Sequence, residues 1–257
     1  MTSDLLTQHR TEGVLTLTLG NGRAHPLSRA MIAALHGALR AAADDSETRV
    51  IVVHGPGSIF CAGHDLKEIA AHRADADQGL AYLTDLFEAC SALMQDIALS
   101  PRPTIAMVEG IATAAGLQLV AACDLAFASE TARVCLPGVR NGGFCTTPAV
   151  AVSRSLGRKH LMELLLSGED RGAVWALNAG LFNAVLPPDQ LAAHVQGFAR
   201  TLATRNPGPI GAGKLAVAAH LQSPLDIAYA QATRVMIDSF MDEGRRAAEA
   251  RQPFAKG

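Results

Sequence analysis

Two short segments of the chain could bind negative charge. Each is rich in small residues and connects an apolar run to a helix-like stretch. The first is Phe60–Glu68 (FCAGHDLKE), and the second is Glu109–Gln118 (EGIATAAGLQ). Small residues let a ligand approach the backbone closely, and the start of a helix offers unpaired N–H groups with partial positive charge. Two such groups aimed at one oxygen would stabilise negative charge developing there. On physical grounds alone, two tight turns without a ligand remain an equally open alternative.

The common motifs for nucleotide, metal and serine-hydrolase chemistry do not occur. Gly55 and Gly57 follow an apolar run, but Phe60 stands where the dinucleotide fingerprint needs its third glycine. The sequence contains no G-x-x-x-x-G-K-[ST], no H-E-x-x-H and no G-x-S-x-G. The nine histidines are scattered, and we interpret His36 and His160 as helix-surface residues. We therefore expect no metal site.

The apolar pattern predicts an α/β protein that positions these segments. The expected strands are Val14–Leu19, Arg49–His54, Thr104–Val108, Leu125–Ala128 and Arg133–Leu136. The expected helices are Ser28–Ala43 with Ser28 as its N-cap, Leu80–Leu99, Leu117–Cys123, Thr146–Leu156, Lys159–Leu166, Ala173–Ala179 and Gln190–Thr204, with wholly helical sequence from Pro207 to Arg251. Strands and helices alternate to about Pro188, so we expect residues 1–190 to form an α/β core with the candidate site. Residues 191–257 are expected to form a helical C-terminal region.

Composition limits the classes of partner and the compartment. The 257 residues are 49% hydrophobic, which is enough for a large core, while a net charge of −2 and 4% aromatic residues argue against nucleic-acid binding. No apolar run is long enough to span a bilayer, and Met1–Arg10 has no apolar signal region. The five cysteines include no C-x-x-C pair, which fits a reduced protein. We expect a cytoplasmic protein without membrane or nucleic-acid partners.

The two segments resemble motifs of the crotonase, or enoyl-CoA hydratase/isomerase, superfamily. Phe60–Ile69 is similar to F-x-A-G-x-D-[LI]-K-E, and Gly110–Asp124 is similar in frame to G-x-A-x-G-G-G-x-E-L-x-x-x-C-D. Ser167–Val185 resembles the later T-G…A-G-L-V…V segment of the family. The resemblance implies a spiral of ββα repeats whose C-terminal helices build homotrimers, often paired into hexamers. It also implies an acyl-CoA substrate, with coenzyme A as part of that substrate and no separate cofactor.

The resemblance implies roles for individual residues. The two oxyanion N–H groups would come from His64 and Ala115, and alanine can serve at the second position if its φ is negative. Arg23 occupies a position where a basic side chain can meet a phosphate. The expected substrate and coenzyme A contacts are Arg23, Ala24, Ala62, His64, Asp65, Leu66, Lys67, Ala115 and Cys145.

Two expected catalytic positions depart from the family pattern. A hydratase of this family uses two glutamates to position water and move a proton between C2 and C3. Gln118 and Gly138 stand at these positions. Glutamine can orient water but cannot accept a proton at ordinary pH, and glycine has no side chain. The segment Arg140–Pro148 resembles a hydratase-like subgroup with an F-C-[ST]-T-P sequence, which we expect to lack both glutamates.

Other residues could replace the glutamates, and each has a structural alternative. Cys145 could be a nucleophile or an acid, or a packed core thiol. The imidazole of His64 could be a general base, or could point away from the substrate. Asp65 is expected to cap a turn, and Glu68 to be exposed.

Three hypotheses about function are compatible with these residues. The first is a lyase or isomerase of the enoyl-CoA hydratase class. The second is a catalytically silent acyl-CoA-binding protein, favoured by the missing carboxylates. The third and weaker hypothesis is thioester hydrolysis by a water that Gln118 holds.

Overall fold

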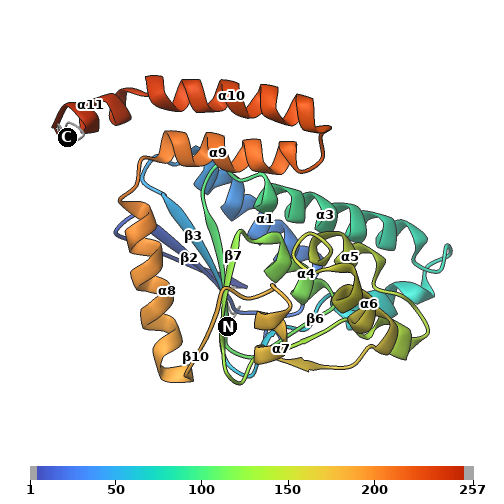
Figure 1. Ribbon diagram of the computed structural model, residues 1–257. Helices are drawn as coiled ribbons and strands as arrows, with labels where there is room; N and C mark the ends of the chain where they lie inside the picture. The colour runs from blue at the N-terminus through green and yellow to red at the C-terminus, as the bar shows by residue number, and fades with distance from the viewer. Residues whose placement is uncertain (1–4, 252–257) are drawn as a thin grey trace.

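The computed structural model describes residues 5–251, whose strands lie in two sheets (Figure 1). The strands are β1 Leu6–Thr11, β2 Val14–Leu19, β3 Val50–Gly55, β4 Ile59–Cys61, β5 Thr104–Val108, β6 Ile111–Thr113, β7 Leu125–Ser129, β8 Arg133–Cys135, β9 Arg171–Gly172 and β10 Ala184–Leu186. The larger sheet has the order β1-β2-β3-β5-β7-β10, and the smaller has the order β4-β6-β8-β9. From β2 to β10, neighbouring strands of the larger sheet run parallel.

Eleven helices lie within the described residues. They are α1 Arg29–Asp44, α2 Leu66–Ala71, α3 Leu80–Ala98, α4 Ala115–Ala122, α5 Thr146–Val152, α6 Arg158–Ser167, α7 Ala173–Asn178, α8 Pro188–Ala203, α9 Pro207–His220, α10 Leu225–Met241 and α11 Glu243–Arg251, with 3-10 turns η1 His72–Ala74 and η2 Pro137–Asn141. Ser28 caps α1 as expected, because its Oγ accepts the N–H of Met31 at 3.1 Å.

The chain advances in ββα units. In each pair β3–β4, β5–β6 and β7–β8, the first strand lies in the larger sheet and the second in the smaller. Helices follow each pair and return the chain to the larger sheet. This arrangement confirms the expected α/β spiral, and it gathers the ends of the second strands in one region.

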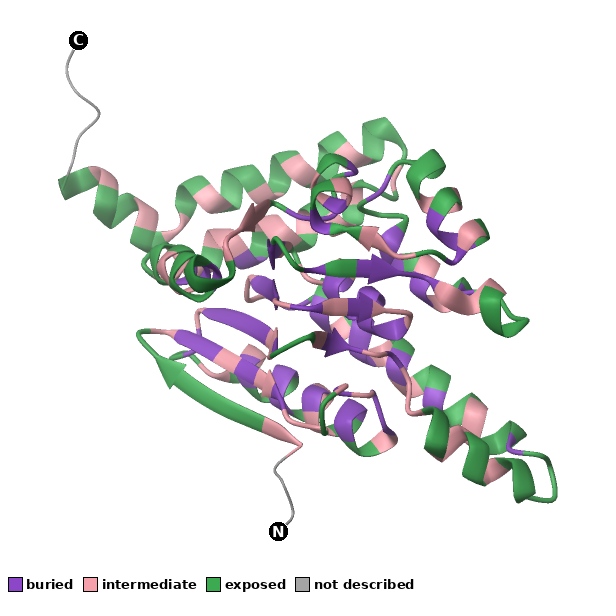
Figure 2. Ribbon diagram, turned by 90° about the horizontal axis from the view of Figure 1, so that it is seen from below, coloured by how far each residue is buried: buried purple, intermediate pink, exposed green. Residues whose placement is uncertain are grey.

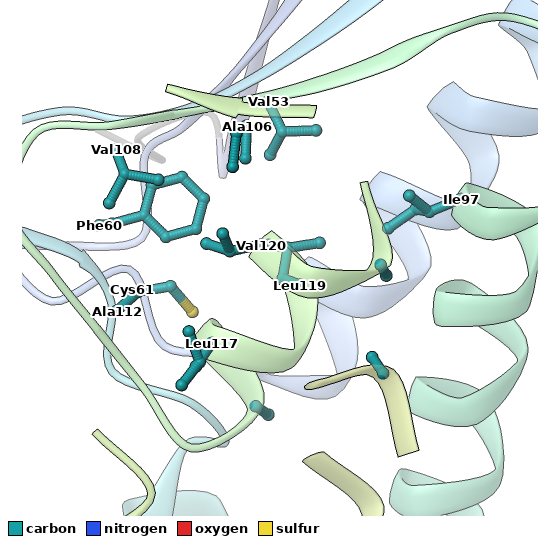
Figure 3. Close-up of a cluster of buried hydrophobic side chains, with 14 of the residues drawn as sticks. Val53, Phe60, Cys61, Ile97, Ala106, Val108, Ala112, Leu117, Leu119 and Val120 are labelled. Carbon is teal, nitrogen blue, oxygen red and sulfur yellow. The ribbon is translucent and has the colours of Figure 1, made fainter. Parts of the chain in front are cut away.

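The short helix α4 is buried on nearly every side between the two sheets. Leu117, Leu119 and Val120 pack against the core around Phe60 (Figure 3). Gly116 allows this close approach, since a Cβ there would lie 2.1 Å from the carbonyl oxygen of Cys61. The contact fixes the start of α4 against the end of β4.

The C-terminal helices divide into a buried and an exposed group. Leu191, Val195 and Ala199 of α8 belong to a core cluster with β3 and β5, so the expected division at 190/191 falls within a helix of the core. By contrast, α10 and α11 have no buried residue, and Figure 2 colours them green and pink, for exposed and intermediate residues. Lys214 joins α9 to the core through Asp124 Oδ2 at 2.8 Å.

Two segments differ from the sequence-based expectation. The edge strand β1 was not predicted, because five of its six residues are exposed and it has no alternating apolar pattern. The polar stretch 71–79, to which the apolar pattern assigns no helix or strand, contains η1 and a turn in which Asp77 accepts the N–H groups of Gly79 and Ala81.

The turn from β6 into α4 holds Ala114 in a strained conformation. Its φ is +52° and its ψ is −121°, a region that residues with a Cβ rarely adopt. Its N–H donates to the carbonyl of Cys135 at 3.0 Å, which helps to hold the turn. Such strain costs about 1–3 kcal/mol.

Replacing Ala114 by glycine should therefore stabilise the protein. We expect Ala114→Gly to raise the free energy of unfolding by roughly 1 kcal/mol, because relief of strain exceeds the loss of backbone entropy. Denaturant unfolding monitored by circular dichroism measures the change. The matched control, Ala121→Gly within α4, should lower stability by about 0.5–1 kcal/mol. Equal destabilisation by both substitutions would contradict the strain assigned to Ala114.

Candidate functional site

The parallel pairing of β4 with β6 brings the two candidate segments together. His64 follows the end of β4, and Ala115 begins α4 directly after β6 and the turn. Gly63 lies between them with φ +86°, and a Cβ there would be 3.1 Å from the backbone nitrogen of Ala115. The structure therefore places the two expected N–H donors beside each other.

The backbone N–H of His64 is directed away from Leu27, the residue with which His64 pairs. Leu27 forms a parallel bridge with His64. The Leu27 N–H donates to the Gly63 carbonyl at 2.8 Å, and the Leu27 carbonyl accepts the Asp65 N–H at 3.3 Å. In this parallel pairing Leu27 makes both hydrogen bonds, so His64, which lies between Gly63 and Asp65, directs its own N–H to the side away from Leu27. Among residues 5–251, that N–H has no acceptor.

The N–H of Ala115 is also available. As the first residue of α4 it has no intrahelical acceptor, and the described part of the chain supplies no other. The helix dipole adds partial positive charge at this end. Ala115 is not among the residues with positive φ, because the left-handed conformation falls on Ala114 instead. Ala115 thus meets the condition that φ be negative, under which alanine can serve in place of the family's glycine.

The loop after β2 lies against the same site. The N–H of Ala62 donates to the carbonyl of Ala24 at 2.9 Å, which brings Arg23 and Ala24 beside the segment that leads into α2. Arg23, Leu66 and Lys67 are exposed. Arg23 and Ala24 are thus adjacent in space to Ala62 and the residues that follow it, although far apart from them in sequence.

The two carboxylates nearest to the site along the chain have structural partners. Asp65 caps α2, as expected, by accepting the N–H of Lys67 at 2.8 Å. Glu68 was expected to be exposed, and this is wrong. Its carboxylate accepts the N–H of Arg29 at 3.0 Å and the hydroxyl of Tyr82 at 2.8 Å, which ties α2 to α1 and α3. Burial, together with the Glu68 carboxylate, raises the pKa of Tyr82 to about 12.

The imidazole of His64 lies in an apolar setting against α3. Its ring meets that of Phe87 edge to face, with the centroids 5.0 Å apart. Its Nε2 is buried and has no hydrogen-bond partner among the described residues. Burial lowers the pKa of His64 to about 4, so the ring is neutral at physiological pH.

Gln118 is buried, with only 4% of its surface exposed. Its Oε1 has no hydrogen-bond partner in the described part of the chain. Helical side chains lean toward the N-terminus, and residues three apart share a face, so Gln118 extends toward the end of α4 that carries the Ala115 N–H. A buried acceptor without a partner is costly, and a bound molecule or water can supply the missing donor.

Gly138 is tightly packed against the residues before α5. A Cβ at Gly138 would lie 2.7 Å from the nitrogen of Cys145 and 3.0 Å from its Sγ. The Gly138 N–H donates to that sulfur at 3.3 Å. Cys145 is buried, and burial raises the pKa of its thiol. Sequence reasoning missed this contact, because no local pattern connects a glycine in η2 with a thiol at the start of α5.

Between residues 5 and 251, no helix has the length and apolarity needed to cross a bilayer. In the same range, no three His, Cys, Asp or Glu side chains gather closely enough to hold a metal ion.

The amino-acid sequence matches a family model and resembles that of known proteins over most of its length. The model of the enoyl-CoA hydratase/isomerase family matches residues 9–256. Enoyl-CoA hydratase domain-containing protein 3 of Rattus norvegicus is 37% identical over 248 residues, which cover 96% of this chain and 81% of that protein.

Solved structures are similar in fold over nearly the whole chain. An enoyl-CoA hydrotase/isomerase family protein from Silicibacter pomeroyi is 62% identical with a TM-score of 0.89, and the match covers 93% of this chain and 99% of that one. Human enoyl-CoA hydratase domain-containing protein 3 is 33% identical with a TM-score of 0.90, covering 98% and 99% of the respective chains.

These comparisons correct one expectation and establish another. The rat, mouse and human relatives are named as mitochondrial proteins, which contradicts the expected cytoplasmic location. The family match extends over nearly all of the sequence and agrees with the fold. The chain therefore belongs to the enoyl-CoA hydratase/isomerase family, the crotonase superfamily.

Proposed function

We propose that this chain binds an acyl-CoA thioester and polarises its carbonyl with the N–H groups of His64 and Ala115. The positions of these two N–H groups support the proposal: each follows one of the paired strands β4 and β6, and neither has an acceptor in residues 5–251. Two donors aimed at one oxygen stabilise the charge that forms when electrons move from the acyl chain toward the carbonyl.

The coenzyme A part of the substrate would lie along the exposed edge of the site. Arg23 can meet a phosphate group, because its side chain is exposed beside the Ala24–Ala62 contact. Ala62, Asp65 and Leu66 lie within two residues of His64 in the sequence and would contact the adenine and pantetheine parts. Coenzyme A enters as part of the substrate, and the proposal needs no further cofactor.

Among the described residues, the candidate site lacks a free carboxylate that could transfer a proton. Gln118 and Gly138 provide no carboxylate, and the carboxylates of Asp65 and Glu68 are engaged in capping and in joining helices. We infer that hydration of enoyl-CoA by a carboxylate pair does not operate here. The chain then acts as a hydratase-like acyl-CoA-binding protein with slow nominal lyase activity.

The C-terminal helices support a proposal about assembly. Apolar side chains of α10 are exposed, among them Leu225, Ile227, Tyr229, Met236, Ile237 and Phe240. Burying such side chains between copies of the chain would be favourable. We propose a homotrimer, or a hexamer made of two trimers, with α9–α11 at the contacts between subunits.

Calorimetric titration can isolate the contribution of the thioester carbonyl. Butyryl-CoA should bind roughly tenfold or more tightly than S-butyl-CoA, a thioether of the same length without the carbonyl oxygen, because two hydrogen bonds contribute about 0.5–1.5 kcal/mol each. Coenzyme A alone is the second control ligand. Equal affinities for the thioester and the thioether would refute the two-donor site, and failure of all three ligands to bind would refute acyl-CoA binding itself.

Steady-state hydration of crotonyl-CoA tests the missing proton transfer. We expect the wild-type protein to turn over no faster than Gln118→Ala, since an amide cannot accept the proton of water. Absorbance of the enoyl thioester follows the reaction. Turnover clearly above this control would mean that Gln118 takes part in hydration.

Because Gly138 is tightly packed, adding a side chain at this position should destabilise the protein. Gly138→Ala should lower the free energy of unfolding by roughly 1–3 kcal/mol, because the new Cβ meets the backbone of Phe144 and Cys145 at under 3 Å. Gly143→Ala in the same loop is the matched control, as its Cβ would lie 3.7 Å from the nearest atom. Denaturant unfolding compares the two, and equal stability would contradict the tight contact.

A further inference from the structure

The thiol of Cys145 lies where the family's second glutamate would begin. Gly138 stands at the position of that glutamate, and a Cβ built on Gly138 would be 3.0 Å from Cys145 Sγ. The sulfur is held there by the N–H of Gly138 at 3.3 Å. The side chain missing from η2 is thus replaced in space by one from the start of α5.

A second, independent feature indicates that a ligand enters this region. Gln118 lies on α4, which packs against α5 in the same core cluster as Cys145 and Ala115. Its Oε1 is buried without a partner, and the side chain extends toward the end of α4 that carries the Ala115 N–H. The amide therefore presents an unmet acceptor next to the position proposed for the thioester carbonyl.

We propose that Cys145 is a substrate-contacting residue whose thiol faces the C2–C3 region of the acyl chain, with the Gln118 amide as the second polar group there. This inference rests on the proposed binding of acyl-CoA. It makes the reacting part of the site neutral, with a thiol and an amide in place of two carboxylates. The Gln118 oxygen can then accept a hydrogen bond from a water or from a 3-hydroxyl group on the acyl chain, while the Cys145 S–H is a weak donor.

A purely structural role for Cys145 makes a different prediction. If the sulfur served only to accept the Gly138 N–H, its reactivity would not respond to acyl-CoA. Contact with the acyl chain requires that a bound thioester cover the sulfur. Alkylation of the thiol separates these cases, because the reagent must reach the sulfur and needs its thiolate form.

The experiment measures alkylation of individual cysteines in the wild-type protein by iodoacetamide, with peptide mass spectrometry at successive times. Cys123, at the opposite end of α4 with its Sγ against the Leu119 carbonyl at 3.4 Å, is the matched control thiol. Saturating butyryl-CoA should slow alkylation of Cys145 at least fivefold and leave the rate at Cys123 unchanged. Cys145→Ser, which retains a polar group for the Gly138 N–H, confirms the assignment of the protected peptide.

Calorimetry on the same samples distinguishes the two ways of failing. If butyryl-CoA binds and the alkylation rate of Cys145 is unchanged, the contact proposed for Cys145 is wrong and acyl-CoA binding stands. If Cys145 and Cys123 are protected equally, the protection reflects general stabilisation and the contact is again overturned. If butyryl-CoA does not bind, both proposals fail.

Discussion

The candidate site depends on how closely the start of α4 approaches the end of β4. Two glycines permit that approach. A Cβ at Gly116 would overlap the Cys61 carbonyl at 2.1 Å, and one at Gly63 would lie 3.1 Å from the Ala115 nitrogen. A side chain at either position would push the helix away from the strand. The N–H groups of His64 and Ala115 would then separate, and they could no longer meet at one oxygen.

Polarising a carbonyl and moving a proton place different demands on the sequence. The first uses backbone N–H groups, so it tolerates alanine at 115 as long as the left-handed conformation is carried by Ala114. The second uses side chains, and we propose that it is lost here, with the fold retained, because Gln118 and Gly138 stand where the family pattern has two carboxylates. A chain can therefore retain the family's architecture and its substrate while losing the family's usual acid–base chemistry.

Sequence reasoning succeeded where local pattern determines structure. The bounds of β2 and β5 were predicted correctly, as was the Ser28 cap, because apolar periodicity and capping are local properties. The proximity of His64 and Ala115 came from the resemblance to a family. The bridge from Leu27 to His64 and the contact between Gly138 and Cys145 could not be predicted, since each joins segments through tertiary packing.

Isotope-edited infrared spectroscopy can measure polarisation of the bound thioester carbonyl. Crotonyl-CoA labelled with ¹³C at the thioester carbonyl would be compared free in solution and bound to the protein. Hydrogen bonds from His64 and Ala115 would weaken the C=O bond, so we expect the labelled carbonyl band to move to lower wavenumber on binding. A bound thioester whose carbonyl band stays at its solution position would show that these two N–H groups do not polarise it.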